Sequence, residues 1–470
     1  MPRKHDFISI DYWTWLSWGK LEESDPAQGG ILMNSYQNQP STDPKLQQAV
    51  PVGLIPRLRS LLTRHGLLIA LTGLFMINAL DRQILIILLE DIKQEFTLSD
   101  SQLGLVSGFA FVAIYITMGI PAAYLADRKN RSKLISLALA LWSLMTVLCG
   151  AAQNYTQLIL ARFGVGIGES ACTPAAHSMI ADTYSRRHRT TALAFYGSGY
   201  FAGAFLGFAL GGWIAEHYGW RAAFYAVGAP GLLFAILTWR YLKEPVRRSV
   251  VSTDTLGLFA SVGVLWKIRA FRWYVSGSSI AVFGYAGIMT WLPTFMIREY
   301  ASSKAEIGAI LGLIVGVGGI AAAMVLGVLT DKLASKDRRW NLWIPALIFS
   351  ISAPATAAAF LVQDMTLTLL LCAIPMVISS AFTPPMISIS QQIVASNLHA
   401  MVTALIFLCN NLIGFGLGPL AVGMLSDHLT PELGEAAALR QALEYLSFFF
   451  FAAACLVLVS IRYLPQPAEE

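Results

Sequence analysis

Charged residues are scarce in this sequence. Asp, Glu, Lys and Arg make up 13% of the 470 residues, about half of the share found in a soluble domain. Hydrophobic residues reach 56% and the mean hydropathy is +0.58. Too little charge is present to cover this apolar material in water, so the composition excludes an ordinary soluble protein and indicates lipid contact.

Cysteine is rare as well. The five cysteines all fall inside apolar runs, and none has CxxC spacing: Cys149, Cys172, Cys372, Cys409 and Cys455. An odd number of cysteines placed in this way argues against a disulfide framework and against a zinc site. We interpret them as small apolar packing residues, and we expect no bound metal.

Three common enzyme signatures are missing. The sequence has no GxxxxGK[ST] phosphate loop, no HExxH and no GxSxG, so ATP hydrolysis, zinc-peptidase and serine-hydrolase chemistry are unsupported. No cofactor is predicted. His177 and Asp182 do have an H-x-x-x-x-D spacing, but this spacing arises easily by chance, and we do not interpret it as catalytic.

Long apolar runs dominate the chain instead. A spanning helix needs about 20 largely apolar residues, and lipid favours helices because it offers the backbone no hydrogen-bond partner. Twelve runs qualify: 67–90, 103–126, 133–152, 157–183, 190–215, 220–242, 273–297, 306–330, 341–362, 366–394, 399–426 and 441–464. We predict an all-α integral membrane protein with twelve transmembrane helices. Pro375, Pro384 and Pro385 predict a kink in the tenth.

Basic residues gather in alternate loops. The loops after the second, fourth, sixth and eighth runs are rich in Lys and Arg, and the opposite loops are poor. The side rich in Lys and Arg should be cytoplasmic. We interpret the net charge of +5 as a topology signal and not as a nucleic-acid-binding surface. Arg57, Arg59 and Arg64 place the N-terminus on that side too, and an even number of helices returns the C-terminus to it.

A long loop divides the helices into two sets of six. It contains an apolar stretch from Leu256 to Trp266 that is too short to span, which we interpret as a segment lying on the membrane surface. The predicted domains are a cytoplasmic tail at 1–66, a bundle at 67–242, a cytoplasmic linker at 243–272, a second bundle at 273–464 and a C-terminal tail at 465–470.

The tail at 1–66 is polar, and we predict that it is disordered. Two other interpretations stay open. Trp13, Trp15 and Trp18 could form an interfacial aromatic segment. Alternatively, part of the tail is an upstream extension and the protein starts at Met33.

A short charged segment recurs in the two halves. Asp127-Arg128-Lys129-Asn130-Arg131 follows the second run, and a related segment around Asp331 follows the eighth, 331 − 127 = 204 residues later. Two similar six-helix halves are the plan of a rocking transporter whose site lies near the bilayer midplane.

The first copy of this segment resembles the loop signature of the major facilitator superfamily, G-x-x-x-D-R-x-G-R-[KR]. Asp127, Arg128 and Arg131 match, whereas Ala123 and Asn130 replace the two glycines. We interpret Asp127, Arg128, Arg131 and Asp331 as gating residues. In this interpretation a helix C-terminus faces basic residues of the next helix in one conformation and releases them in the other. The alternative is a solvated loop that serves only topology.

Four further motifs are similar to the spinster family: NALDRQIL at 78–85, LSDSQLG at 98–104, ARFGVGIGE at 161–169 and WLP at 291–293. The resemblance extends from about residue 70 to residue 464. It implies the major facilitator fold and transport of amphipathic lipids with an anionic head, such as sphingosine phosphate or lysophospholipids. For bacterial members it also implies proton-driven transport.

Four charged residues lie inside apolar runs: Asp81 and Arg82 in the first, Arg162 and Glu169 in the fourth. Each costs about 2.5–3.5 kcal/mol at the bilayer centre, which makes a functional site the default hypothesis. Arg162 and Glu169 are about 10 Å apart along one helix, so Arg82 is the better partner for Glu169. Asp81 and Glu169 are candidate proton carriers. Arg82 and Arg162 are candidates for binding an anionic headgroup or for neutralising the carboxylates, and the alternative is a purely structural set of ion pairs.

These observations predict a proton-coupled secondary transporter, not an enzyme. It would move an amphipathic or organic-anion solute across the bacterial inner membrane by alternating access. A metabolite or drug transporter without lipid preference is the first alternative, and a passive lipid scramblase or a membrane-embedded enzyme is the second. The expected partners are a small-molecule or lipid-like substrate, protons and membrane lipids, but no nucleic acid, and we expect a monomer.

Overall fold

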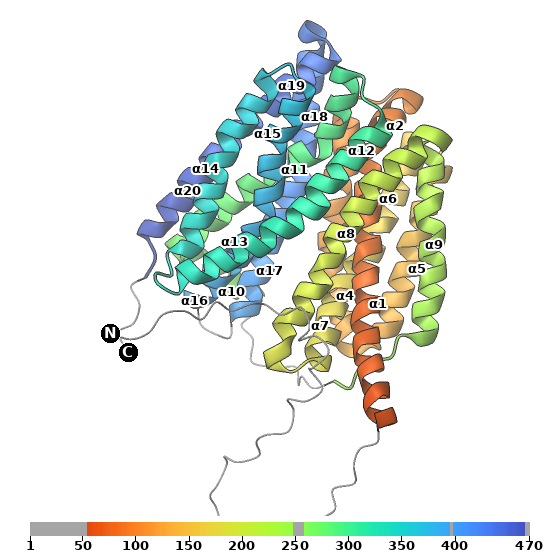
Figure 1. Ribbon diagram of the computed structural model, residues 1–470, viewed down its shortest axis with the longest axis vertical. Helices are drawn as coiled ribbons and strands as arrows, with labels where there is room; N and C mark the ends of the chain where they lie inside the picture. Colours follow the sequence, from red (N-terminus) through yellow and green to blue (C-terminus); the bar gives the residue numbers. More distant parts are fainter. Residues whose placement is uncertain (1–53, 248–257, 395–397, 466–470) are drawn as a thin grey trace, which may run out of the picture. The chain divides into compact units, whose positions relative to one another are not determined.

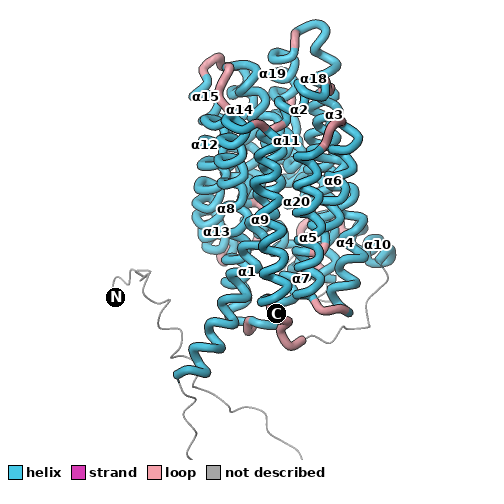
Figure 2. Tube along the Cα trace, turned by 90° about the vertical axis from the view of Figure 1, so that its right-hand side faces the viewer, coloured by secondary structure: helices cyan, strands magenta, loops and turns pink. Residues whose placement is uncertain are grey.

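A computed structural model describes residues 54–247, 258–394 and 398–465 of the chain. Residues 58–470 form one compact unit. All regular elements in the described ranges are helical, and these ranges contain no strand (Figure 2). The all-α prediction is confirmed. The interpretations of Trp13, Trp15, Trp18 and Met33 concern residues outside the described ranges, as does the predicted tail beyond residue 465.

Eleven helices of the described ranges are long and apolar enough to span a membrane: His65–Ile87, Asp100–Arg128, Arg131–Ala151, Arg187–Tyr218, Trp220–Tyr241, Arg269–Tyr300, Lys304–Ala334, Trp340–Leu361, Met365–Gln392, Met401–Leu433 and Glu435–Arg462. The remaining predicted run, 157–183, is split at Ala171 into α6 (Tyr155–Ser170) and α7 (Cys172–Thr183). Neither piece is long enough to span alone. With this broken span counted, the predicted twelve-helix fold is confirmed.

Most predicted runs correspond to single helices or to helices in series. In the first half these are α1 (Leu54–Ile87), α3 (Asp100–Gly104), η2 (Leu105–Phe109), α4 (Ala110–Arg128), α5 (Arg131–Ala151), α8 (Arg186–Tyr218) and α9 (Trp220–Tyr241). In the second half they are α11 (Arg269–Tyr300), α12 (Lys304–Gly312), η3 (Leu313–Gly318), α13 (Gly319–Ala334), α14 (Trp340–Leu361), α15 (Met365–Ile378), η4 (Ser379–Ala381), α16 (Thr383–Gln392), α17 (His399–Cys409), η6 (Asn410–Leu417), α18 (Gly418–Leu433), α19 (Glu435–Glu444) and α20 (Leu446–Arg462).

Two short helices lie outside these runs, and α1 begins earlier than predicted. α2 (Leu89–Phe96) follows α1, and α10 (Leu258–Lys267) covers most of the apolar stretch in the long loop. α1 begins at Leu54, inside the segment predicted as a tail, although its membrane span begins only at His65. Hydropathy detects the part of a helix that contacts lipid, so it misses a polar turn that continues the helix into water.

Several spans are locally irregular. The tenth is interrupted by the 3₁₀ turn η4 where the kink was predicted, with Pro375 before this turn and Pro384 and Pro385 after it. Three spans contain π-helical segments, η2, η3 and η6. Such segments often occur at functional sites.

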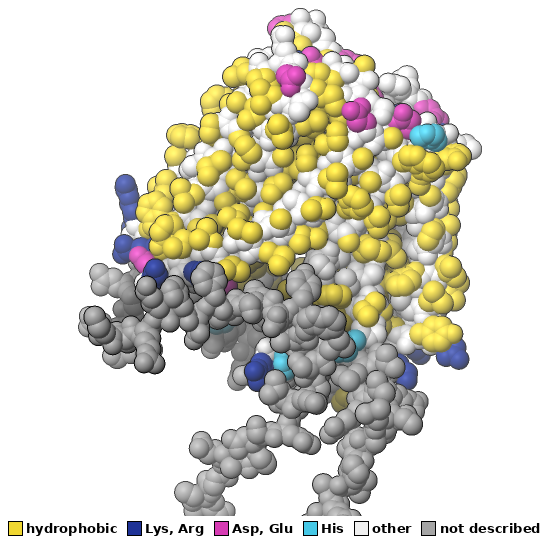
Figure 3. All heavy atoms as spheres, viewed as in Figure 1, with side chains coloured by type: hydrophobic (Ala, Val, Ile, Leu, Met, Phe, Trp, Pro, Cys, Tyr) yellow, Lys and Arg dark blue, Asp and Glu magenta, His cyan; other side chains and the backbone are white. Residues whose placement is uncertain are grey.

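The spans place two sets of loops at opposite ends of the unit formed by residues 58–470. We call these the α2 end, which also holds the turn between α18 and α19, and the α10 end, which also holds the C-terminal turn of α7 (Figure 1). On the face shown in Figure 3, hydrophobic side chains cover the middle, acidic side chains gather toward the α2 end and basic ones toward the α10 end. This is the surface expected of a membrane-spanning bundle.

The two halves touch closely at the α2 end. A Cβ atom added at Gly104 would lie 2.5 Å from the Pro419 carbonyl oxygen, and one added at Gly308 would lie 2.3 Å from the Phe208 carbonyl oxygen. Each contact joins a helix of the first half to one of the second. The absence of a side chain at these two glycines therefore lets the backbones of the two halves meet, as in other tightly packed membrane helices.

Candidate functional site

The four predicted membrane-core charges come together as two ion pairs between α1 and α6. Asp81 and Arg82 are consecutive on α1 and point in different directions. Asp81 pairs with Arg162, and Arg82 pairs with Glu169. The prediction that Arg82, not Arg162, is the partner of Glu169 is confirmed.

The Asp81 pair is sealed inside the first half. Its Oδ1 lies 3.5 Å from a terminal nitrogen of Arg162, and the side chains are 1% and 2% exposed. Thr146 of α5 donates a hydrogen bond to the other carboxylate oxygen. The Asp81 carboxylate is therefore held from two sides by its own half and has little contact with any open space.

The Arg82 pair lies at the edge of an accessible space. The Nε atom of Arg82 donates to Glu169 Oε2 over 2.8 Å, and the Arg82 side chain is 29% exposed, whereas Glu169 is fully buried. The guanidinium also faces the rings of Phe111 and Tyr115, whose centroids lie 4.8 and 5.0 Å away. Glu169 accepts from Nε of Arg82 only. The two terminal guanidinium nitrogens of Arg82 therefore do not contact Glu169 and can bind another acceptor.

One oxygen of Glu169 is left without a hydrogen-bond partner among the described residues. This atom, Oε1, is buried, and burial of an unpaired carboxylate oxygen is costly. A proton on Oε1 would neutralise the carboxylate and so lower the cost of burying its charge. The pair therefore combines a partly exposed cation with a buried carboxylate that has one oxygen without a partner.

The second half has no comparable charges in its membrane core. Every Asp, Glu, Lys and Arg in its described spans lies close to a span end. Its central polar groups are uncharged, and Ser278 and Ser279 of α11 both donate to Asn410 Oδ1 over 3.0 Å. The site is thus charged on one wall and uncharged on the other.

The gating residues are arranged differently from the predicted clamp. Arg131 is buried and binds Asp182 of α7 and Glu244, each over 2.6 Å. Asp127 is exposed and makes no side-chain ion pair with any described residue, whereas its carbonyl oxygen accepts a hydrogen bond from Arg247. Arg247 also binds the Ala126 carbonyl oxygen over 2.8 Å.

The expected contact between Asp127 and the neighbouring arginines is therefore not formed in this conformation. The cation at the C-terminus of α4 comes from the segment after α9, which lies beside the last carbonyls of that helix. Arg128 is exposed and lies over the Tyr124 ring, 3.6 Å from its centroid. Asp331 is exposed, and its carboxylate has no partner in the described part of the chain.

Arg131→Ala should destabilise the protein strongly. The substitution removes the buried cation that pairs with both Asp182 and Glu244, and removing one partner of a buried pair typically costs about 3–5 kcal/mol. Thermal unfolding in detergent measures the effect, with Arg128→Ala as the control, since Arg128 is exposed. Equal melting temperatures for the two variants would contradict a structural role for the Arg131 cluster.

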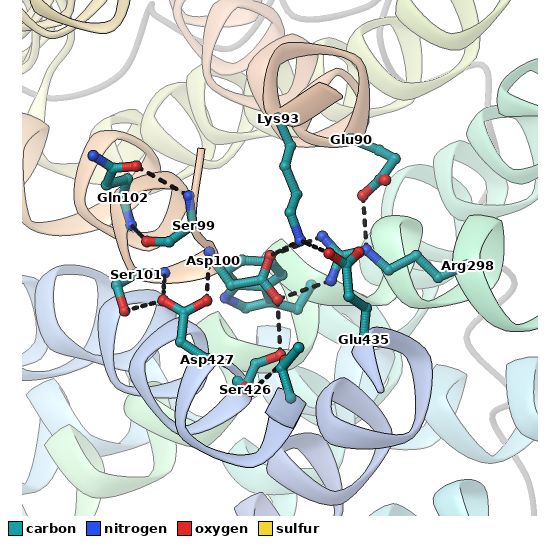
Figure 4. Close-up of polar contacts among 12 residues, drawn as sticks. Glu90, Lys93, Ser99, Asp100, Ser101, Gln102, Arg298, Ser426, Asp427 and Glu435 are labelled. Atoms are coloured by element: carbon teal, nitrogen blue, oxygen red, sulfur yellow. Dashed lines mark hydrogen bonds and ion pairs between the residues drawn. The ribbon is translucent and has the colours of Figure 1, made fainter. Parts of the chain in front are cut away.

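A second charged cluster, which sequence reasoning missed, joins the two halves at the α2 end (Figure 4). Two terminal nitrogens of Arg298 on α11 donate to the two carboxylate oxygens of Asp100 on α3, each over 2.8 Å. Lys93 lies 3.0 Å from Asp100 Oδ1, and Ser426 of α18 donates to Oδ2 over 2.7 Å. Asp100 is 1% exposed, so its carboxylate is closed to water.

The cluster continues on both sides of Asp100. Arg298 Nε binds Glu90 over 2.7 Å, and Lys93 also reaches Glu435 over 3.1 Å. Asp427 of α18 accepts from the backbone nitrogens of Asp100 and Ser101, each over 2.8 Å. A carboxylate of the second half thus caps the helix that begins at Asp100, where the helix dipole favours negative charge. These bonds hold the α2 end closed.

One part of the missed cluster carried a sequence signal. Ser99 and Gln102 form a capping box, in which each side chain accepts from the other residue's backbone nitrogen. The S-x-x-Q pattern within LSDSQLG is typical of a helix start. The pattern marks the helix but does not reveal that Asp100 binds Arg298, which lies 198 residues further along the chain.

Membrane-core ion pairs in one half, an uncharged facing half and an ionic closure at one end together define a secondary transporter. Residues 71–419 match the Major Facilitator Superfamily, and the chain belongs to that superfamily. Its similarity to spinster proteins makes it a transporter of the spinster type, as predicted.

The relatives agree on transport. Over 400 residues the chain is 35% identical to an MFS-type efflux pump of Mycolicibacterium smegmatis, covering 84% of this chain and 92% of that protein. It is 28% identical over 416 residues to protein spinster homolog 1 of Xenopus tropicalis, covering 81% and 77%. The crystal structure of a bacterial homolog of the human lysosomal transporter spinster, inward-facing and unoccupied, has a TM-score of 0.77 and 28% identity. It covers 86% of this chain and 99% of that one.

Proposed function

We propose that this transporter moves an amphipathic organic anion across the bacterial inner membrane by proton-coupled alternating access. The observation that carries the proposal is the Arg82–Glu169 pair. It presents a cation, 29% exposed, to a space deep in the bundle, beside a fully buried carboxylate. An anionic head would bind Arg82 by replacing Glu169 as its partner, and Glu169 would then take a proton.

The uncharged second half supports an amphipathic substrate. A headgroup needs the charges of α1 and α6, whereas an acyl chain needs a wall without charges. The hydroxyls of Ser278 and Ser279 are already used by Asn410. A sphingosine-1-phosphate transporter of Danio rerio, 25% identical over 411 residues, is consistent with this substrate class.

The 35% identical efflux pump favours a second candidate, a drug or metabolite exporter without lipid preference. Uptake into proteoliposomes distinguishes the two. We expect an imposed pH gradient to drive accumulation of a lysophospholipid or a sphingoid phosphate, but not of a short organic anion of equal charge. Accumulation of the short anion alone would favour the second candidate, and equilibration without accumulation would indicate a scramblase.

We propose that the α10 end is cytoplasmic and that both termini lie on that side. The basic side chains at this end support the orientation (Figure 3). In this orientation the structure, closed at the α2 end, is the inward-facing state, the state of the solved bacterial homolog. The six-helix bundles at 67–242 and 273–464 would rock as units within a monomer.

Reporter fusions after Arg248 and after Glu470 test the orientation. Both should give a cytoplasmic signal, because Lys and Arg are concentrated in loops on the α10 side. A fusion at Gln153, an exposed residue of the opposite set of loops, is the control and should give a periplasmic signal. A periplasmic signal from either of the first two fusions would overturn the orientation.

A further inference from the structure

Two hollows lie next to each other, one on the first half and one where the two halves meet at the α2 end, and neither is lined by the membrane-core charges. The first is a cavity of about 350 Å³ between α1, α8 and α9, and all fourteen of its lining residues are apolar. The second is a polar pocket of about 430 Å³ at the α2 end, lined by residues that include Asp91, Glu95 and Lys304.

The apolar cavity opens toward lipid. Leu210 lines it and is 49% exposed, and Ala226 and Pro230 of α9 line it and are also exposed. A cavity with only apolar walls does not hold ordered water but does bind apolar molecules. Its volume lies within the range of ligand sites. In a bilayer, the available apolar occupant is an acyl chain.

The length of the cavity matches one leaflet. Its lining on α1 extends from Gly73 to Ile84, and this 11-residue separation (84 − 73) corresponds to about 16 Å along the helix. Half of a hydrocarbon core of roughly 30 Å is about 15 Å. One acyl chain of the leaflet at the α2 end therefore fits the cavity along its length.

The polar pocket lies where the headgroup of that chain would be. Ile214 lines the cavity, and the next residue of α8, Ala215, lines the polar pocket. Asp91 follows Ile84 by seven residues, about two helical turns. Trp220 also lines the pocket and donates to Glu95 over 2.7 Å, and tryptophan is enriched at the headgroup level of membranes.

The charges in the pocket suit a headgroup with both signs. Lys304 Nζ lies 2.6 Å from Asp91 Oδ1, but Asp91 Oδ2 is buried and has no hydrogen-bond partner among the described residues. Burial raises the pKa of Asp91 although the Lys304 ammonium lies beside it. Glu95 also lines the pocket, but Arg221 already pairs with its carboxylate, so Asp91 Oδ2 is the acceptor left for an ammonium group.

We propose that these two hollows form one binding site for a zwitterionic phospholipid, such as phosphatidylethanolamine. One acyl chain fills the apolar cavity, the ammonium lies beside Asp91, and the phosphate lies beside Lys304. Asp91 belongs to the first half and Lys304 to the second. The bound lipid therefore contacts both halves at the α2 end and stabilises the conformation in which that end is closed.

Native mass spectrometry of the purified protein, after stepwise delipidation and addition of one lipid at a time, tests the site. The wild-type protein should retain one phosphatidylethanolamine and much less phosphatidylglycerol, which lacks the ammonium. Ala226→Trp fills the mouth of the cavity and should reduce retention of the lipid severalfold, because the indole ring occupies the space of the acyl chain. Ala229→Trp is the matched control, because Ala229 is exposed on the same helix and does not line the cavity.

Lys304→Met provides an independent test, because it removes the proposed phosphate contact and leaves the cavity unchanged. It should lower retention of phosphatidylethanolamine even if the tryptophan variant fails to fold. Equal retention by Ala226→Trp and Ala229→Trp would overturn the acyl-chain site. Equal retention of the two lipids by the wild-type protein would overturn the assignment of the headgroup.

Discussion

Glu169→Gln should abolish solute accumulation driven by a pH gradient. Glutamine keeps the size of the side chain and resembles the protonated acid, but it cannot release a proton. In the structure Glu169 is fully buried beside Arg82, so loss of its charge also frees the guanidinium for a substrate anion. We therefore expect the variant to bind substrate and exchange it across the membrane, without concentrating it.

The measurement is solute uptake into proteoliposomes with and without an imposed pH gradient. Arg82→Gln should instead weaken binding of the anion, because it removes the exposed cation and leaves Glu169 buried without its partner. Full pH-driven accumulation by Glu169→Gln would exclude this residue from the proton path. The Arg82–Glu169 pair would then be a structural contact between α1 and α6.

Asp81→Asn tests whether Asp81 carries a proton as well as Glu169. Asp81 is held by Thr146 and Arg162 within the first half and is 1% exposed, so it lacks the accessible partner that Glu169 has. If only Glu169 carries the proton, Asp81→Asn should still accumulate solute under a pH gradient, at a level set by its folding. Loss of gradient-driven uptake by well-folded Asp81→Asn would make both carboxylates proton carriers.

The sequence predicted the spans and the central ion pairs because both have a physical cost in lipid. An apolar run of about 20 residues predicts a transmembrane helix. A charged side chain inside such a run needs a partner. The seven-residue spacing of Arg162 and Glu169 excluded a direct contact between them, which left Arg82. Neither argument depends on how the two halves pack.

The ionic cluster at the α2 end was not predictable in the same way. Asp100 and Arg298 lie at span ends, where a charge costs little and so gives no signal. Their pairing depends on the contact between the halves. The arrangement around Arg131 was missed for a related reason, because its partner Glu244 and the nearby Arg247 belong to the segment after α9 and not to the recognised motif.

Arg298→Gln should shift the protein toward the conformation that is open at the α2 end. Arg298 is 5% exposed and binds both Asp100 and Glu90 across the boundary between the halves. Removing one partner of a buried charge network typically costs about 3–5 kcal/mol, but only in the closed conformation, since opening hydrates the carboxylates. That cost corresponds to a change of about 10²–10³-fold or more in the ratio of the two conformations.

Distances between spin labels at exposed Gln153 and Glu432, one in each half near the α2 end, report this ratio. The wild-type protein should show a short distance, and Arg298→Gln should show mainly a longer one. Glu299→Gln is the matched control, because it breaks an ion pair with Arg440 at the same end but within the second half. Since that pair is present in both conformations, its loss should leave the distances unchanged. An unchanged distribution in Arg298→Gln would mean that the packing of the glycine-lined helices, and not the ionic cluster, holds the α2 end closed.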